Sequence, residues 1–419
     1  MDVIITPSSL SGEIKVPSSK SLAHRAIIAS SLASGKSIIK NISYSADIEA
    51  TIKAMEALGS EIIRNGDSVT IYGCYPRRIN NVIDANESGS TLRFIIPIAM
   101  LSDEPVRFIG HNNLCNRPLD PYLDSFDELG IAYKRGGSYL PLDIASRLRP
   151  GEYNICGNIS SQFITGLLFA LPLLEADSVI NITTPLESKG YIDLTLDILR
   201  LYGITIINND YKSFIIEGNQ EYKPHDYTVE GDYSQAAFYL CMDALGADIK
   251  LLDMNLSSHQ ADLRILKDLE AMGSTIIYED GRLSCTRASS PTLIDLSQSP
   301  DLGPVLAALM SLIKGKSKLI GASRLRLKEC DRISSMELEL NKIGDICKST
   351  IDSMTIKGVE FIGGVEFDSH NDHRVAMALS ILALRASSDI RIKNASCVNK
   401  SYPSYWEDFK SLGGEVRYE

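Results

Sequence analysis

Short polar clusters stand directly before apolar segments of this sequence, and their side chains are of the kinds that bind anions or transfer protons. The first cluster, Ser-Ser-Lys-Ser at 18–21 with Arg25 close behind, precedes the apolar residues 26–33. A segment that is apolar on most sides predicts a buried helix, and the N-terminus of such a helix has unpaired N–H groups and a positive dipole. Serine, lysine and arginine gathered there fit a phosphate or a carboxylate. Taken alone, the stretch is equally consistent with a capped core helix and a solvated lysine.

The same arrangement returns five times along the chain. A polar cluster precedes each of the apolar segments 94–101, 163–174, 236–245, 305–313 and 375–384, and these clusters span 87–93, 160–162, 232–235, 301–304 and 371–374. Five of the six clusters contain groups that could contact an anion or exchange a proton. The repetition favours a functional interpretation of the first cluster.

A second periodic signal comes from amphipathic segments that end on a glycine. These glycines lie 70 to 73 positions apart, and they are Gly59, Gly130, Gly203, Gly273, Gly344 and Gly414. Glycine is expected just past the last helical turn because it accepts a positive φ. A strand, a turn and usually a second strand follow each glycine, most clearly as the hairpin 61–64 and 68–72.

The two signals together define a repeating unit of strand, buried helix, strand, surface helix, strand and strand. It occurs six times with a period near 70 residues, which predicts an α/β fold. Six units are too many for one hydrophobic core, so we expect two domains of three units each. The expected bounds are 18–227 for the first domain and 1–17 with 228–419 for the second.

Composition limits the classes of function. The chain has 419 residues, of which 44% are hydrophobic, and a net charge of −11, which argues against nucleic-acid binding. Any cationic site must therefore be local. No apolar run reaches the roughly 18 residues that span a membrane, and the N-terminus enters a strand without a basic leader. Eight scattered cysteines without a Cys-x-x-Cys pair indicate reduced thiols, and we expect a cytoplasmic protein.

Two tempting motifs fail on their spacing. The Gly-Lys-Ser triplets at 35–37 and 315–317 lack the glycine five positions earlier that a phosphate-binding loop requires. The pair His370 and His373 lacks the glutamate of a zinc-protease motif. We therefore expect neither a P-loop nor a metal site.

Cations at predicted helix starts give the strongest argument for anionic substrates. Lys328 and Arg332 flank one such start, Arg374 lies at another, and Lys400 precedes the last helix. Positive charge at the positive end of a helix is unfavourable unless an anion joins it. The recurrence of this placement predicts that the protein binds anions.

These residues carry a resemblance to a known family. The ordered motifs are Ser19-Lys-Ser21 with Arg25, Gly89-Ser-Thr-x-Arg93, Asn116-Arg-Pro118, Ser160-Ser-Gln-Phe163, Ser188-Lys-Gly-Tyr191, Asp301, Lys328-Glu-x-Asp-Arg332, Asn371-Asp-His-Arg374 and Lys400. Their order and spacing resemble those of EPSP synthases, the 3-phosphoshikimate 1-carboxyvinyltransferases of the shikimate pathway, over essentially the whole chain. The resemblance implies a two-domain enolpyruvyl transferase fold with three βαβαββ units per domain. In that fold, parallel buried helices point their N-termini at a cleft that closes on the substrates.

The resemblance also implies a reaction and two binding sets. The enolpyruvyl group of phosphoenolpyruvate passes to the 5-hydroxyl of shikimate 3-phosphate, phosphate is released, and neither a cofactor nor a metal is needed. The residues implied for shikimate 3-phosphate are Lys20, Ser21, Arg25, Ser160, Ser161, Gln162, Ser188, Tyr191, Asp301 and Lys328. Those implied for phosphoenolpyruvate are Lys20, Gly89, Arg117, Gln162, Arg332, Arg374 and Lys400. The expected protein is a monomer without nucleic-acid or membrane partners.

Three residues are implied as catalytic. Asp301 would be the base for the hydroxyl, with Lys20 sharing the proton, and Glu329 would protonate the methylene carbon. His373 is a further candidate of lower rank. A carboxylate among many cations should be ionised, which conflicts with Glu329 as a resting acid.

One departure from the family pattern concerns glyphosate. Glu87-Ser88 stands where many members have Asn-Ala, whereas Gly89 is kept. Since only glycine lets a ligand approach its backbone so closely, we expect glyphosate to inhibit in competition with phosphoenolpyruvate.

Two other functions are consistent with part of the pattern. UDP-N-acetylglucosamine enolpyruvyl transferases share the fold and the donor, and Cys115 lies near Arg117 as a reactive loop cysteine would. That family, however, has Lys-Asn at its first motif and lacks the Ser-Ser-Gln triplet. A non-catalytic anion-binding protein would gain nothing from Asp301 and Glu329 among cations.

Overall fold

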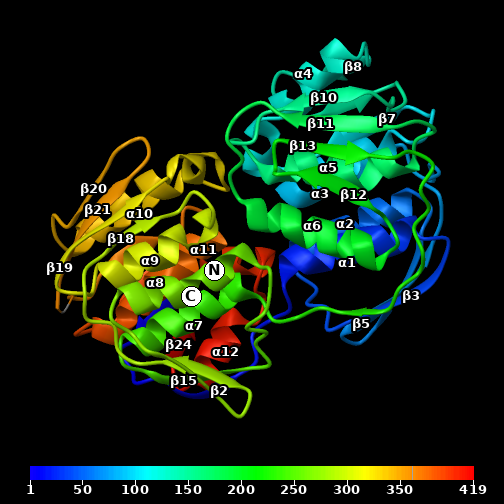
Figure 1. Cartoon of the computed structure of the whole chain (residues 1–419). Coiled ribbons are helices and arrows are strands. Elements are labelled where there is room, and N and C mark those ends of the chain that lie inside the picture. The colour runs from blue at the N-terminus through cyan, green and yellow to red at the C-terminus, as the bar shows by residue number, and fades with distance from the viewer. Residues whose placement is uncertain (361) are drawn as a thin grey trace. The chain divides into compact units, whose positions relative to one another are not determined.

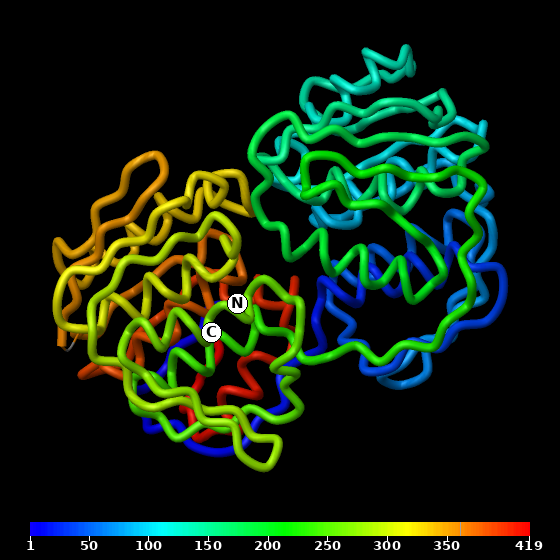
Figure 2. Tube along the Cα trace, viewed as in Figure 1, coloured from blue at the N-terminus to red at the C-terminus, as the bar shows by residue number. Residues whose placement is uncertain are grey.

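The computed structural model describes residues 1–360 and 362–419, which form two compact units (Figure 1). Unit 1 consists of Met1–Ser19 and Glu230–Glu419, and unit 2 consists of Lys20–Val229. Both ends of the chain therefore belong to unit 1, as the trace in Figure 2 shows. The bounds suggested by the sequence, 18–227 and 1–17 with 228–419, differ from these units by two residues at each crossing.

Within the described residues, each unit contains three sheets of four strands. Those of unit 2 have the strand orders β14-β3-β5-β4, β6-β7-β9-β8 and β10-β11-β13-β12. Their strands are β3 (Gly35–Lys40), β4 (Glu61–Asn65), β5 (Ser68–Gly73), β6 (Val82–Asp84), β7 (Val106–Ile109), β8 (Tyr133–Arg135), β9 (Leu142–Ile144), β10 (Glu152–Ile155), β11 (Ser178–Ile182), β12 (Ile206–Asn209), β13 (Ser213–Ile216) and β14 (Tyr227–Thr228).

The sheets of unit 1 have the strand orders β22-β23-β1-β24, β16-β17-β15-β2 and β18-β19-β21-β20. Their strands are β1 (Val3–Thr6), β2 (Ser11–Ile14), β15 (Asp248–Leu252), β16 (Ile276–Glu279), β17 (Arg282–Cys285), β18 (Leu293–Asp295), β19 (Gly315–Ile320), β20 (Cys347–Ser349), β21 (Met354–Gly358), β22 (Glu366–Asp368), β23 (Ile390–Lys393) and β24 (Glu415–Tyr418).

Two kinds of helix alternate along the chain. The buried helices are α1 (Lys20–Leu32), α3 (Gly89–Ala99), α5 (Ser161–Ala170), α7 (Tyr233–Ala244), α9 (Gly303–Met310) and α11 (His373–Ser380). The partly exposed ones are α2 (Ala46–Ala57), α4 (Asp120–Glu128), α6 (Lys189–Leu201), α8 (Ile265–Ala271), α10 (Arg332–Leu340) and α12 (Tyr405–Ser411). Short 3₁₀ turns connect them: η1 (Asn112–Asn116), η2 (Leu171–Leu173), η3 (Ala261–Arg264), η4 (Pro300–Leu302), η5 (Ser323–Leu327), η6 (Asn341–Ile343), η7 (Ile381–Arg385) and η8 (Ala395–Lys400).

The predicted α/β repeat is confirmed, and its clearest copy runs from β6 to β9. In that copy β6 and β7 are parallel, β7 and β9 are antiparallel, and β8 and β9 form the hairpin. Other sheets are completed by strands from distant parts of the chain. β1 joins the last sheet beside β23 and β24, and β2 joins β15. The N-terminal residues therefore pair with strands of the C-terminal half, as the sequence analysis expected.

Apolar side chains of the six buried helices and of the inner strand faces form one hydrophobic core in each unit. Glycines past the partly exposed helices have the predicted positive φ, for example Gly59 at 102° and Gly203 at 82°. One prediction is wrong by a residue, because Gly413 and not Gly414 adopts positive φ (95°) after α12. The helix ends one residue earlier than its apolar pattern suggested, with Leu412 as its C-cap.

Among the described residues, no helix combines the length and the apolar character needed to cross a membrane.

Candidate functional site

In unit 2 the predicted site residues lie at the N-termini of α1, α3, α5 and α6. Lys20 is the first residue of α1, and its Nζ lies 2.7 Å from Oδ2 of Asp47 in the first turn of α2. Both side chains are mostly shielded, with exposed fractions of 19% and 11%. Asp47 was not among the predicted site residues. The ion pair fixes the position of the Lys20 ammonium at the start of α1.

Arg25, one turn into α1, is held by oxygen atoms of α1 and α6. Its Nε donates to Thr195 Oγ1 at 2.9 Å, its Nη1 to the Ser21 carbonyl at 2.7 Å, and its Nη2 to the Tyr191 carbonyl at 2.9 Å. Burial lowers the pKa of Arg25 to about 10, so the guanidinium stays charged at neutral pH. These partners fix its orientation beside Ser21 and Tyr191, two of the residues with which it was predicted to act.

Gly89 begins α3, and the guanidinium of Arg117 lies against it. A Cβ built at Gly89 would stand only 2.7 Å from Arg117 Nη1 and 2.9 Å from Cζ. Arg117 is 7% exposed and directly follows η1. The structure thus brings these two predicted residues together, and it supplies a steric reason for glycine at this position.

Gln162 is the centre of a third group in unit 2. Its Oε1 accepts from Arg93 Nη1 at 2.8 Å, and its Nε2 donates to Ser90 Oγ at 2.8 Å. Ser160 caps α5 by accepting from the Gln162 backbone N–H at 3.3 Å. Arg93 belongs to a quoted motif but was not a predicted site residue. Its hydrogen bonds to Gln162 on α5 and to the Pro118 carbonyl show that it orients Gln162.

Two further serines stand at helix starts in unit 2. Ser161 is the first residue of α5 and is 5% exposed. Ser188 precedes α6 with a left-handed backbone, φ +57°, and is 2% exposed. A serine in that conformation is uncommon and marks a position where local geometry is set by the surrounding structure.

In unit 1 the carboxylate of Asp301 is surrounded by three cations. Its Oδ1 lies 3.1 Å from Lys328 Nζ and 2.9 Å from Arg332 Nη1, and its Oδ2 lies 3.3 Å from Arg374 Nη2. Burial alone would raise the pKa of Asp301, but Arg374, Lys328 and Arg332 hold it well below its usual range. Asp301 is therefore ionised at neutral pH and can accept a proton only after some of this charge is drawn elsewhere.

Arg332, the first residue of α10, joins three carboxylates. It is 1% exposed and contacts Asp301, Glu329 Oε2 at 2.6 Å and Asp372 Oδ2 at 2.7 Å. Burial would lower the pKa of Arg332, but these carboxylates raise it well above its usual value. The sequence argument that only an incoming anion could balance this cation is wrong for Arg332, because carboxylates from two other segments do so.

Lys328 lies in a largely buried position beside both carboxylates and other cations. Burial lowers its pKa to about 8, with Asp301 opposing and Arg332 and Arg324 adding to the effect. The ammonium is 3.1 Å from Asp301. It is therefore the cation in this cluster whose charge changes closest to neutral pH.

The remaining predicted residues lie in the first turn of α11 and at the end of η8. Asp372 caps α11 by accepting from the Arg374 N–H at 2.8 Å, and Lys400 Nζ donates to the Asn371 carbonyl at 3.3 Å. His373, the lower-ranked candidate, is 2% exposed, with Nδ1 3.9 Å from Asp372 Oδ1. Asp372 was not predicted as a site residue, although its position within Asn-Asp-His-Arg was a usable signal.

One more carboxyl near Asp301 was missed. Asp262 in η3 is 2% exposed, and its Oδ2 accepts a hydrogen bond from Ser234 Oγ at the start of α7. Burial, then the charge of Asp301, raises the pKa of Asp262 to about 7. The local sequence gave no sign of this, because Asp301 lies 39 positions further along the chain.

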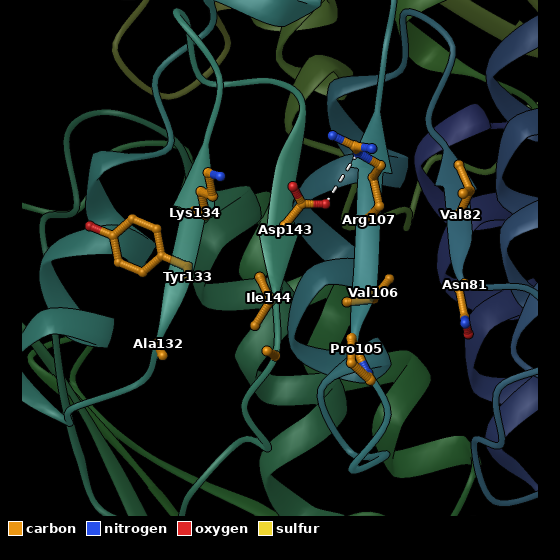
Figure 3. A pocket seen from close by; sticks show the side chains of 11 residues that line it. Asn81, Val82, Pro105, Val106, Arg107, Ala132, Tyr133, Lys134, Asp143 and Ile144 are labelled. Carbon is orange, nitrogen blue, oxygen red and sulfur yellow. Dashed lines mark ion pairs between the residues drawn. The ribbon is translucent and has the colours of Figure 1, made fainter.

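A surface hollow of about 430 Å³ lies away from these groups, on one face of the β6-β7-β9-β8 sheet (Figure 3). Its lining includes Val106, Tyr133 and an ion pair of Arg107 Nε with Asp143 Oδ1 at 3.1 Å. The described residues that line it include no predicted site residue.

The described residues contain no cluster of three or more histidine, cysteine or acidic side chains that could hold a metal ion. The two sets of side chains can bind anions and transfer protons. Unit 2 offers cations and hydroxyls at helix N-termini, whereas unit 1 offers paired carboxylates and cations.

Comparison with known proteins gives a consistent result. Residues 4–409 match the family model described as EPSP synthase (3-phosphoshikimate 1-carboxyvinyltransferase). A 3-phosphoshikimate 1-carboxyvinyltransferase from Clostridium perfringens is 51% identical over 100% of this chain and 99% of its own length. A relative of the same name from Clostridioides difficile is also 51% identical, over 98% of this chain and 97% of its own length.

Solved structures share the fold at lower sequence identity. An EPSP synthase from Acinetobacter baumannii superimposes with a TM-score of 0.81 at 24% identity and covers 100% of both chains. The enolpyruvyl transferase NikO from Streptomyces tendae gives 0.79 at 16% identity, covering 100% of this chain and 98% of its own.

Proposed function

The chain belongs to the EPSP synthase family, and we propose that the side chains gathered in its two units carry out that family's reaction. The chain is an enzyme of the shikimate pathway, which leads to chorismate and the aromatic amino acids. It transfers the enolpyruvyl group of phosphoenolpyruvate to shikimate 3-phosphate. The observation that best supports the assignment of roles is the cluster in unit 1, where Arg332 bridges Asp301 and Glu329.

The reaction has two steps with defined proton movements. The 5-hydroxyl oxygen of shikimate 3-phosphate bonds to C2 of phosphoenolpyruvate, its proton goes to a base, and the methylene carbon gains a proton from an acid. The tetrahedral intermediate then loses phosphate and a methyl proton, which gives the enolpyruvyl ether. The chemistry requires an acid and a base in suitable positions, and it requires cations that bind three anionic groups.

We assign shikimate 3-phosphate to hydroxyls and cations that are already oriented. Ser160, Ser161 and Ser188 bind its phosphate, because serines at helix starts offer hydroxyl and N–H groups to an anion. Arg25 and Ser21 hold its carboxylate. Tyr191 lies beside the shikimate ring, and Lys328 also binds shikimate 3-phosphate.

Phosphoenolpyruvate is assigned to a second set of residues, which shares Lys20 and Gln162 with the first. Lys20, Arg117 and the backbone at Gly89 belong to unit 2, and the contact of Arg117 with Gly89 supports their acting together. The unit 1 cations of this set are Arg332, Arg374 and Lys400. Arg332 and Arg374 already contact the same carboxylate, that of Asp301.

Asp301 is assigned as the base, with Lys20 sharing the proton, and Glu329 as the acid. Because its cationic neighbours hold the pKa of Asp301 well below the usual range, Asp301 is a weak base in this arrangement. Anionic substrates pair with Arg374 and Arg332 and so lessen the effect of these cations on Asp301. The pKa of the Asp301 carboxyl then rises, which makes it a stronger base. The same substrate contacts weaken the 2.6 Å ion pair of Glu329 with Arg332. The Glu329 carboxyl can then hold the proton that it gives to the methylene carbon.

The family assignment makes the chain a glyphosate target, and we propose competition with phosphoenolpyruvate. We further propose that the protein acts as a cytoplasmic monomer and that residues 18–227 and 1–17 with 228–419 are its functional domains. No organic cofactor or metal is invoked.

Phosphate release from phosphoenolpyruvate tests the function directly. With shikimate 3-phosphate as acceptor we expect release, and with UDP-N-acetylglucosamine we expect none. Release with the second acceptor alone would contradict the proposal and make Cys115 the residue to test. A folded sample that releases phosphate with neither acceptor would also contradict it.

Scattering measurements with and without shikimate 3-phosphate test domain closure. The elution volume at several protein concentrations tests the monomeric state.

A further inference from the structure

A line of buried hydrogen bonds joins three helices of unit 2. His24 Nδ1 on α1 lies 2.7 Å from Thr51 Oγ1 on α2, and Thr51 Oγ1 lies 2.7 Å from Thr91 Oγ1 on α3. Thr91 Oγ1 donates to Ser88 Oγ at 2.8 Å or to the Asp47 carbonyl at 3.3 Å. All four side chains in this line are at most 1% exposed. We call His24, Thr51, Thr91 and Ser88 the threonine line.

The threonine line ends beside two assigned binding residues. Asp47, whose carbonyl accepts from Thr91, carries the carboxylate that holds Lys20 Nζ at 2.7 Å. At its other branch, Ser88 is the N-cap of α3, directly before Gly89, where Arg117 packs. The line therefore connects the start of α2, which holds Lys20, to the start of α3, which carries Gly89.

Hydrogen positions along the line follow from counting donors. Burial, then the charges of Lys20 and Arg25, lowers the pKa of His24 well below its usual value, so the imidazole is neutral. No described residue offers a hydrogen bond to its buried Nε2. A buried N–H without an acceptor is costly, whereas an unpaired acceptor is tolerated more often. The proton therefore lies on Nδ1, which donates to Thr51.

The other end of the line gives the same direction. The Asp47 carbonyl can only accept, so the single hydroxyl hydrogen of Thr91 points to that carbonyl or to Ser88. Thr91 must then accept from Thr51, and Thr51 must accept from His24. The hydrogen bonds from His24 to Thr51 and from Thr51 to Thr91 thus have one direction, whichever acceptor Thr91 uses, and such a buried network favours one relative placement of the helices that it joins.

We propose that His24 is a positioning residue that acts through Thr51 and Thr91 to fix Lys20 and the Gly89 turn for phosphoenolpyruvate. This inference rests on the proposed function for the identity of the ligand. It does not depend on that function for the direction of the hydrogen bonds. The threonine line itself contacts α1, α2 and α3 and leaves the assigned serines of α5 and α6 to other contacts.

Nitrogen NMR of the full-length protein tests the proton direction. With ¹⁵N-labelled histidine, and with His24→Gln to identify the signal among the six histidines, we expect a neutral Nδ1–H tautomer that does not titrate between about pH 5.5 and 8.5. An Nε2–H tautomer, or a titration within that range, would overturn the proposal. This result is independent of any activity.

Kinetics of matched variants test the positioning role. Thr51→Val keeps the shape but cannot pass on the hydrogen bond, and we expect KM for phosphoenolpyruvate to rise roughly tenfold. KM for shikimate 3-phosphate, to which Lys20 also contributes, should rise by no more than about threefold, because the Gly89 turn serves phosphoenolpyruvate alone. Thr51→Ser keeps a hydroxyl and should restore most of the loss.

Ser30→Ala is the structural control. Ser30 is a buried hydroxyl on the same helix α1, 2.6 Å from Tyr202 Oη, and it lies outside the threonine line. Its loss should lower the melting temperature without changing KM. Equal kinetic effects of Thr51→Val and Ser30→Ala, or equal changes in both KM values, would overturn the positioning role. A wild-type protein that turns over neither acceptor would instead refute the proposed function and leave the NMR result standing.

Discussion

The two units hold their cations in different ways. In unit 2, Arg25 and Arg93 are bound by neutral oxygen atoms of Thr195, Ser21, Tyr191, Gln162 and Pro118. In unit 1, Lys328, Arg332 and Arg374 are bound by the carboxylates of Asp301, Glu329 and Asp372. Neutral partners orient a cation and leave its charge available to an anion. Carboxylate partners cancel the charge and shift the pKa of both groups.

The difference suggests a division of labour. Unit 2 has the properties of a binding surface for anions, although one of its assigned cations, Lys20, is paired with the carboxylate of Asp47. Unit 1 has the properties of an acid–base centre, since each charge there depends on its neighbours. A substitution should therefore change mainly KM in unit 2 and mainly kcat or a pH profile in unit 1.

Asp301→Asn should give the largest effect. It removes the assigned base while leaving a side chain of the same shape near Lys328 and Arg332. We expect kcat to fall by about 10²–10⁴-fold, with binding of shikimate 3-phosphate retained when measured by calorimetry. Asp345→Asn, an exposed carboxyl of the same unit at 82% side-chain exposure, is the control. If binding of shikimate 3-phosphate were lost together with turnover, Asp301 would act mainly in binding. The difference between the two units would then not hold.

Gly89→Ala should act mainly on KM. The new Cβ would stand 2.7 Å from Arg117 Nη1 and push the guanidinium from its place. We expect KM for phosphoenolpyruvate and the inhibition constant of glyphosate to rise about 10- to 100-fold. The matched control is Gly137→Ala, because no described heavy atom lies within 4 Å of a Cβ built there. Steady-state kinetics in which only kcat changed would contradict the binding role of this turn.

Binding of shikimate 3-phosphate should depend on the charge of Lys328. Its pKa of about 8 means that the ammonium loses its proton as pH rises from 7 to 9, so one cation disappears from the cluster. We expect affinity to fall severalfold over that range, measured by calorimetry, and Lys328→Arg to flatten the profile because arginine stays charged. A fall of the same size in Lys328→Arg would assign the titration to another group.

Asp262 should give the smallest effect, on stability. Its pKa is raised to about 7, so the folded protein keeps a proton between about pH 4 and 7 that the unfolded chain has lost. This stabilising contribution is complete below pH 4 and is lost as pH rises through 7. Asp262→Asn buries no charge, and its melting temperature should exceed that of the wild type by a few degrees at pH 8 and by little at pH 5. A pH-independent difference in thermal scans would contradict the raised pKa.

Much of this architecture could be predicted because it is encoded locally. Apolar segments such as 26–33 and 305–313 are long enough to require burial, and glycines such as Gly59 and Gly203 end the alternating helices. The ordered motifs from Ser19 to Lys400 identified the family, since residue type and spacing suffice for that.

Other features depend on contacts between distant residues. Nothing in the sequence shows that Asp47 holds Lys20, that Asp372 joins Arg332 across 40 residues, or that Asp262 lies near Asp301. The same is true of the threonine line, whose members fall on three separate helices. Helical and strand periodicity determine which side of an element is buried. The partners of a buried charge or hydroxyl are decided only when the helices pack, because the unpaired group must then find the nearest complementary atom.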